Sequence, residues 1–170
     1  AIDAFKPIWD NLDIDPDFSG FEISQQGELY RLAAYLVSNY GHQKGLANSQ
    51  ERAKNLFYKA ILIFESLDQS LKVAEAQNAL SVCYSLEGAF REAESILEQT
   101  ANDFLSDQLN LIYLQNRGNL LLTKYRQKKY QEALEIIKEI EVPMEFCEDL
   151  RSCFVYHEKA GLIYRATNQF

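Results

Sequence analysis

The chain has 170 residues, of which 47% are hydrophobic and 12% aromatic, so it can bury a core and form either one ordinary domain or a short repeat array. Its 25 acidic and 17 basic residues give a formal net charge of -8, which repels phosphate backbones and anionic membrane surfaces. We therefore expect neither a nucleic acid nor a membrane among the partners of this segment.

Cysteine usage and apolar runs indicate the cellular setting. Cys83, Cys147 and Cys153 include no CxxC pair and cannot all pair with one another, which favours a reducing compartment. No apolar run approaches the ~20 residues of a membrane span, and the N-terminus lacks a signal-peptide pattern. We expect a cytoplasmic protein and, because the chain starts at Ala1 and its one methionine is Met144, a piece of a longer or processed chain.

Taken in chain order, the first expected elements are a short helix at residues 2–12 and an acidic loop at Asp13–Gly20, within an N-terminal region of residues 1–23. Over residues 24–170, apolar side chains recur at three- and four-residue spacing, the pattern of amphipathic helices. In this array we expect helices at residues 24–40, 49–66, 70–87, 90–103, 106–127, 130–141 and 146–168. Pro143 is expected to mark the link between the last two.

The array repeats with a period of 40 residues. Gly88 can adopt the left-handed backbone conformation that ends one helix before the next begins, which predicts an antiparallel helix pair. The same turn position recurs at Asn48, Gly88, Lys128 and Asn168. A small residue follows each of the first three turns, at Ala53, Ala93 and Ala133. A large apolar residue comes next, at Phe57, Leu97 and Ile137. We expect the alanines where paired helices cross, since bulkier residues would push the axes beyond ~8–10 Å.

Seven residues of the second repeat form a recognisable pattern: Leu80, Ser81, Tyr84, Gly88, Phe90, Ala93 and Leu97. This pattern resembles the tetratricopeptide repeat (TPR), whose helix A carries W-x2-L-G-x2-Y and whose helix B carries A-x3-F. The resemblance covers about residues 25–170. It implies an all-α, right-handed superhelix, or α-solenoid, of antiparallel helix pairs with about eight helices. About three and a half repeats would be present, the last lacking helix B.

The repeats differ from the family in two respects. The period is 40 residues instead of the usual ~34. The first aromatic position of helix A holds Val37, Gln77, Arg117 and His157. Longer repeats of this kind are similar to those of bacterial TPR proteins that sense peptides or regulate transcription, which implies a bacterial regulatory protein.

The resemblance also implies a binding surface, because five positions of each helix A line a concave groove in the family. The residues at these positions that we expect to contact a partner are Glu75, Asn78, Val82, Gln115, Leu122, Tyr125, Arg126, Glu158, Leu162 and Arg165. Asn78, Tyr125 and Arg126 are the strongest candidates. A buried Asn or Arg needs a hydrogen-bond partner, which a bound peptide could supply.

Val82, Leu122 and Leu162 would form an apolar strip along this groove. Such a strip suits an extended peptide or a partner helix. Ordinary buried contacts between neighbouring helices would explain the same three residues equally well, since helices in stacked repeats bury more than one face.

The acidic loop is only partly similar to a calcium-binding loop. Asp13, Asp15 and Asp17 have the required alternate spacing, but Phe18 and Ser24 stand where such a loop needs glycine and glutamate. We expect a solvated loop and no metal site.

No other residues indicate chemistry. His42 and His157 have no cysteine or aspartate at zinc-ligand spacing. Cys147 and Cys153 are expected on one helix, where they would point about 120° apart and fill space, with no redox role. The sequence has no glycine-rich phosphate loop and no G-x-S-x-G elbow. We therefore expect no catalytic residue, no cofactor and no enzyme.

The resulting hypothesis is a non-enzymatic scaffold for protein-protein interaction, a module of a larger regulator that binds a peptide or partner helix in the concave groove. The alternative is a peptide-ligand sensor whose superhelix changes pitch on binding and which a small ligand would stabilise against heat. The missing last helix B predicts that Ala160, Ile163 and Tyr164 face water or a second molecule. A homodimer through this uncapped half-repeat is one expected outcome.

Overall fold

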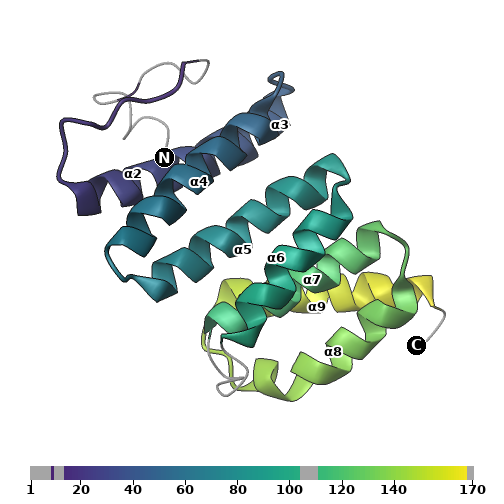
Figure 1. Ribbon diagram of the computed structural model, residues 1–170. Coiled ribbons are helices and arrows are strands. Elements are labelled where there is room, and N and C mark those ends of the chain that lie inside the picture. Colours follow the sequence, from purple (N-terminus) through teal and green to yellow (C-terminus); the bar gives the residue numbers. More distant parts are fainter. Residues whose placement is uncertain (1–8, 10–13, 104–110, 168–170) are drawn as a thin grey trace. The chain divides into compact units, whose positions relative to one another are not determined.

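A computed structural model describes residues 9, 14–103 and 111–167 (Figure 1). Over these residues the chain is all-α, with 81% of them in helices and none in a strand, which confirms the expected all-α class. The elements are α2 (Ile23–Leu36), the π-helix η1 (Val37–Gly41), α3 (His42–Lys44), α4 (Ser49–Ser66), α5 (Ser70–Glu87), α6 (Phe90–Asn102), α7 (Leu111–Arg126), α8 (Tyr130–Glu145) and α9 (Leu150–Ala166).

Most helix boundaries agree with the sequence pattern. The predictions at 49–66 and 70–87 coincide with α4 and α5, and the prediction at 90–103 ends one residue late. The helix expected at 2–12 lies outside the described residues except for Trp9. The first helix of the array was expected as one rod, but α2 passes into the π-helix η1. Gly41 permits this change of winding next to α4, since a Cβ atom there would lie 2.5 Å from Ser49 Cβ.

The expected role of Pro143 is wrong, because this residue lies inside α8. Proline has no backbone N–H to donate to the Glu139 carbonyl, yet the helix continues past it to Glu145. The link follows later, and α9 begins at Leu150 instead of residue 146. The Asp149 carboxylate caps α9 by accepting a hydrogen bond of 2.8 Å from the backbone N–H of Ser152.

The chain divides into two compact units, residues 1–87 and 88–170. In the first unit α4 packs against both α2 and α5 (Figure 1). Gly27 of α2 allows this approach, because a Cβ atom there would lie 2.7 Å from Cε1 of Phe64 on α4. The acidic loop is anchored to the same unit by Phe18, which is fully buried and packs edge-on against the ring of Tyr30.

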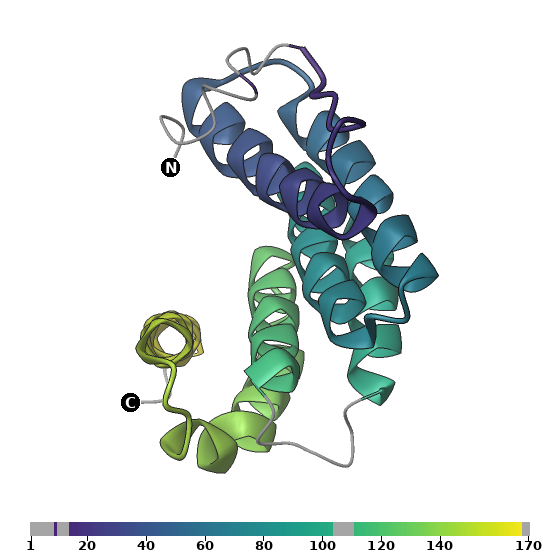
Figure 2. The same cartoon turned by 90° about the vertical axis from the view of Figure 1, so that its left-hand side faces the viewer.

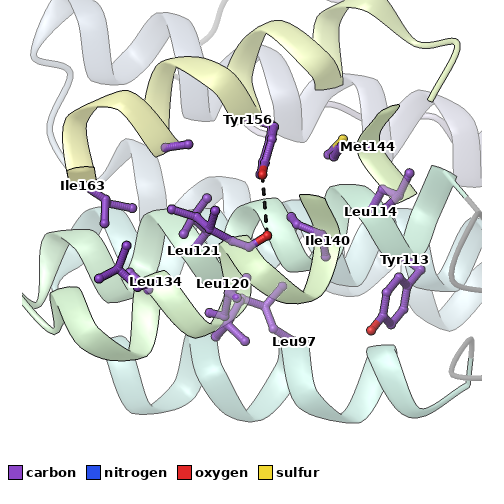
Figure 3. Packing of buried hydrophobic residues seen from close by; sticks show 14 of the residues in the cluster. Leu97, Tyr113, Leu114, Leu120, Leu121, Leu134, Ile140, Met144, Tyr156 and Ile163 are labelled. Atoms are coloured by element: carbon purple, nitrogen blue, oxygen red, sulfur yellow. Dashed lines mark hydrogen bonds between the residues drawn. The ribbon is translucent and has the colours of Figure 1, made fainter. Parts of the chain in front are cut away.

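In the second unit α7 packs against α6 and α8, and α9 packs against both α7 and α8. Figure 2 shows α9 end-on while α7 and α8 run across the view, so α9 crosses both helices. The core between them is continuous and apolar (Figure 3). Its members from α7 to α9 include Leu114, Leu120, Leu121, Leu134, Ile137, Ile140, Met144, Tyr156 and Ile163.

The 40-residue period predicted from the sequence is visible in the backbone and in the core. Asn48, Gly88 and Lys128 all have left-handed backbones, with φ of 55°, 82° and 61°. The small-residue position is fully buried each time, with 0% exposure at Ala53, Ala93 and Ala133. The large apolar position is at most 1% exposed at Phe57, Leu97 and Ile137. These equivalences confirm the period.

Polar contacts repeat with the same period. The Asn116 side chain donates a hydrogen bond of 3.0 Å to the Leu97 carbonyl, and the Tyr156 hydroxyl donates one of 3.5 Å to the Ile137 carbonyl. The two donors are 40 residues apart in the sequence, and so are the two acceptors. In both pairs, a helix that opens one repeat is therefore joined to the second helix of the repeat before it.

Substitutions at two of the left-handed turns should change the stability in opposite directions. In this conformation the Cβ atom of Lys128 lies close to a backbone carbonyl and strains the turn. Lys128→Gly is therefore expected to raise the free energy of unfolding by about 1 kcal/mol. Gly88→Ala introduces the same strain and should lower it by about 1 kcal/mol. Gly161→Ala is the matched control, because Gly161 lies within α9 in open space, where alanine stabilises the helix by about 1 kcal/mol. Urea denaturation followed by circular dichroism measures all three, and a loss of stability in Lys128→Gly would contradict the strain argument.

Candidate partner-binding surface

The residues predicted to line a groove fall on three helices of the two units. In the first unit, α5 carries Glu75, Asn78 and Val82. Asn78 is buried, Val82 is partly buried, and the Glu75 carboxylate lies 3.4 Å from Arg31 of α2. Glu75 therefore takes part in an ion pair that joins α5 to α2.

The other seven predicted residues lie on two contacting helices of the second unit. They are Gln115, Leu122, Tyr125 and Arg126 on α7, and Glu158, Leu162 and Arg165 on α9. Gln115, Glu158 and Arg165 are exposed, and the two leucines are half-buried. We refer to Gln115, Leu122, Glu158, Leu162 and Arg165 as the α7–α9 surface. It is the part of the predicted groove that a partner can reach within one unit.

Asn78, Tyr125 and Arg126, the strongest predicted contacts, also take part in interactions within the chain. Asn78 and Arg126 each already take part in an interaction within the chain, so neither waits for a hydrogen bond from a partner. Burial lowers the pKa of the Arg126 guanidinium. Tyr125 packs against the core cluster and against the ring of Tyr130, with centroids 6.0 Å apart. All three side chains therefore contribute to the fold.

Each residue of the predicted apolar strip is more exposed than a residue next to it in sequence. Leu122 and Leu162 remain partly exposed, whereas the adjacent Leu121 and Ile163 are 0% exposed. Val82 in the first unit is partly exposed as well. Within the second unit, Leu122 and Leu162 thus combine contacts to neighbouring helices with apolar surface that a partner could contact.

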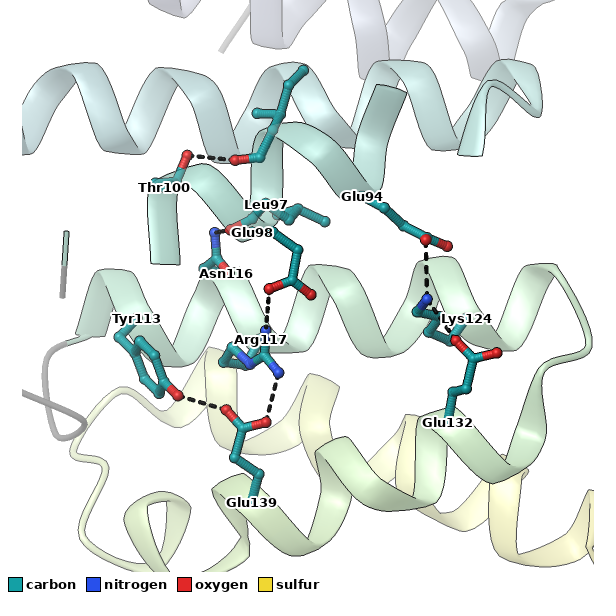
Figure 4. A network of polar contacts seen from close by, with 11 residues as sticks. Glu94, Leu97, Glu98, Thr100, Tyr113, Asn116, Arg117, Lys124, Glu132 and Glu139 are labelled. Atoms are coloured by element: carbon teal, nitrogen blue, oxygen red, sulfur yellow. Dashed lines mark hydrogen bonds and ion pairs between the residues drawn. The ribbon is translucent and has the colours of Figure 1, made fainter. Parts of the chain in front are cut away.

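A network of ion pairs fixes α7 between its neighbours (Figure 4). The Lys124 ammonium lies 3.0 Å from Glu94 of α6 and 2.7 Å from Glu132 of α8. Burial alone would raise the pKa of Glu94, but hydrogen bonds from Gln127 and Lys124 outweigh it and hold the pKa below its usual value. Glu94 is thus a paired carboxylate and not a candidate acid or base.

Glu139 of α8 is the centre of the other half of this network. Its carboxylate accepts hydrogen bonds of 2.5 Å from both the Tyr113 hydroxyl and the Arg117 guanidinium (Figure 4). Burial and the hydrogen bond with Glu139 raise the pKa of the Tyr113 hydroxyl to about 12. The arrangement holds α7 in register with α8 and has no free nucleophile or base among these three groups.

The expectation for the last helix is wrong in its details. Ala160 and Ile163 are 6% and 0% exposed, and Tyr164 packs against the core, because α9 turns these residues toward α7 and α8. The opposite side of α9 is the exposed one, where Leu150 and Phe154 are 84% and 70% exposed. Sequence reasoning missed this face, although a comparison of Phe154 with its counterpart Leu114 could have indicated it.

The cysteine geometry also differs from the prediction. Cys147 precedes α9 instead of lying in it, and the Cys153 thiol donates a hydrogen bond of 3.2 Å to the Cys147 carbonyl. Desolvation and the neighbouring Cys147 raise the pKa of Cys153, and burial raises that of Cys83 to about 11. Both thiols are therefore protonated near neutral pH and weakly nucleophilic.

Within the described ranges, no group of three His, Cys, Asp or Glu side chains is placed to hold a metal ion. None of the helices described is both long and apolar enough to cross a membrane. No protein-family model, curated protein or solved structure matches the chain.

Proposed function

We propose that the chain is a non-enzymatic scaffold for protein-protein interaction that binds a peptide or a partner helix on the α7–α9 surface. The observation that carries the proposal is the pair of half-buried leucines at equivalent repeat positions, Leu122 and Leu162, on two helices in contact. Exposed Gln115, Glu158 and Arg165 complete this surface. Partly exposed apolar side chains with polar groups of both signs nearby suit a protein ligand.

The proposal includes the TPR-like arrangement that the sequence resembles. Helix pairs that recur every 40 residues, with the same turn conformation and the same buried alanine, support a stack of repeats. We propose that these repeats continue as a right-handed superhelix in a cytoplasmic, bacterial regulator. Such a scaffold acts by holding partners together, so it requires no reacting group.

Charge reversal on α9 tests the proposed surface. Glu158→Lys combined with Arg165→Glu changes two exposed side chains, so the fold is expected to persist. A protein that binds the wild-type chain should bind this double variant about tenfold more weakly, the size expected for loss of anchoring contacts. Affinity capture identifies the protein, and calorimetry with the purified protein measures the dissociation constants.

The matched control reverses one acid and one base on the exposed side of α8, as Glu135→Lys with Lys138→Glu. It should leave the dissociation constant unchanged. Equal weakening by both double variants would reduce the effect to general electrostatics, and full binding by the α9 double variant would reject the α7–α9 surface.

A further inference from the structure

The two sides of α9 have opposite character. One side carries Tyr156, Ala160 and Ile163, which are at most 6% exposed and pack against α7 and α8. The other side carries Leu150 and Phe154, one helical turn apart and 84% and 70% exposed. Two large apolar side chains in water on one face of a helix are characteristic of an interaction surface.

The internal period shows what normally covers this side. Phe154 and Gly161 are the counterparts of Leu114 and Leu121 of α7, 40 residues earlier. These two leucines are 1% and 0% exposed in α7, whereas Phe154 and Gly161 are exposed in α9. The same positions are therefore buried in one repeat and open in the next.

Although α9 also packs on α7, the helix that side-chain contacts place next to this side of α7 is α8. The contacts that show it are the hydrogen bonds from Tyr113 and Arg117 to Glu139 and the ion pair between Lys124 and Glu132. His157 is the counterpart of Arg117 on α9, and it is exposed. The exposed side of α9 thus repeats the surface on which α7 receives α8, and no described element covers it.

The helices at the position of α8 share one apolar pattern. An alanine is followed four and seven residues later by buried side chains, and all nine are at most 1% exposed. The three sets are Ala53, Phe57 and Ala60 in α4, Ala93, Leu97 and Thr100 in α6, and Ala133, Ile137 and Ile140 in α8. This pattern defines the kind of helix that packs at this place in the repeat.

We propose that the side of α9 formed by Leu150, Phe154, His157 and Gly161 binds an amphipathic helix with this pattern: alanine, then a large apolar residue four positions later, then Ala, Thr or Ile three positions after that. The site continues the α7–α8 interface and is distinct from the α7–α9 surface. We infer a helix as the occupant because the equivalent surface of α7, in the same unit, is covered by the helix α8.

The residues that differ between equivalent positions of α7 and α9 specify further what the bound helix should carry. Gly161 stands where α7 has Leu121, and the space where its side chain would project is open to 4 Å. Phe154 is larger than its counterpart Leu114, so it fills more space at its own position, one turn or more before Gly161. His157 and Tyr164 replace the two cations Arg117 and Lys124. The bound helix should therefore carry a bulky apolar residue opposite Gly161 and needs no glutamates like those of α8.

A peptide with the chain's own α8 sequence, residues 129–145 labelled with fluorescein, serves as the probe. Fluorescence anisotropy with the 170-residue chain should show saturable binding. Phe154→Asp should weaken the binding about tenfold or more, because it places a charge in an apolar contact. Leu150→Asp is the second variant, and because Leu150 is 84% exposed, this variant should fold like the wild type and still lose binding.

The controls separate this site from other surfaces. Leu62→Asp changes a leucine of α4 that is 65% exposed and should leave the affinity unchanged. The Glu158→Lys and Arg165→Glu double variant should also bind the probe normally, so that failure of the α7–α9 surface and failure of this site are distinguishable. A probe with Ala133→Glu should not bind.

Three results would overturn the proposal. The first is the absence of saturable binding, and the second is equal binding by wild type, Phe154→Asp and Leu150→Asp. The third is a wild-type dimer, detected by light scattering, that Phe154→Asp dissociates while the probe does not compete, since a second copy of the chain would then occupy the site.

Discussion

Replacing Phe57 by alanine is expected to lower the free energy of unfolding by about 3–5 kcal/mol, the usual cost of removing a fully buried aromatic ring. Phe57 is 1% exposed, and its ring packs edge-on against Tyr35 with centroids 5.2 Å apart. The equivalent change in the second unit, Ile137→Ala, should cost about 2–5 kcal/mol because the removed side chain is smaller. Chemical denaturation followed by circular dichroism measures both losses.

An exposed phenylalanine provides the control for this comparison. Phe154 is 70% exposed, so Phe154→Ala should change the stability by no more than about 0.5 kcal/mol. Hydrogen exchange adds a spatial test. Phe57→Ala should accelerate exchange in the unit of residues 1–87, and Ile137→Ala in the unit of residues 88–170. A loss below about 1 kcal/mol in both variants would show that these repeat positions are not core positions.

The repeat itself could be predicted from the sequence because its signals are local and independent. Glycine or asparagine, which tolerate positive φ, stands at three of the four turns, and an alanine and a large apolar residue follow the first three turns at fixed distances. Lys128 is the informative case, since lysine rarely adopts this conformation, yet its φ is 61°. The period alone assigned it to a turn, and the structure agrees.

The errors in the boundaries have local causes of another kind. Pro143 is predicted to mark the link between two helices, but it lies inside α8, where the hydrogen bond that it lacks does not end the helix. The start of α9 depends on the cap by Asp149, a single hydrogen bond that hydrophobic periodicity does not report. The π-helix at Gly41 depends on the close approach of Ser49, which only the tertiary structure shows.

The candidate surfaces were harder to predict because exposure depends on neighbours that are distant in sequence. The pattern assigned Asn78 to the groove, but could not reveal that its side chain is 4% exposed and already takes part in an interaction within the chain. It also assigned exposure to the wrong side of α9, since nothing local in Ile163 or Phe154 tells which side the other helices cover. An amphipathic pattern shows that a helix has a buried face. Where a helix carries apolar residues on two sides, only the tertiary structure determines which of them is buried.

The alanine at the helix crossing gives the second large effect. Ala133→Leu is expected to lower the free energy of unfolding by about 1–3 kcal/mol, because a residue with 0% exposure has no room for three more carbon atoms. Ala53→Leu and Ala93→Leu should each cost a similar amount. Leucine and alanine differ little in helix propensity, so the loss would come from the separation of the packed helices. Chemical denaturation of the three variants measures it.

Ala166→Leu is the matched control for these variants, since Ala166 is exposed in the last turn of α9. It should leave the stability within about 0.5 kcal/mol of the wild type. Similar losses at all three buried alanines, with no loss at Ala166, require three equivalent close contacts, as a 40-residue repeat of helices demands. A loss at only one of the three would mean that the other two helices pack loosely enough to accept leucine, and the period would then describe the sequence without describing the packing.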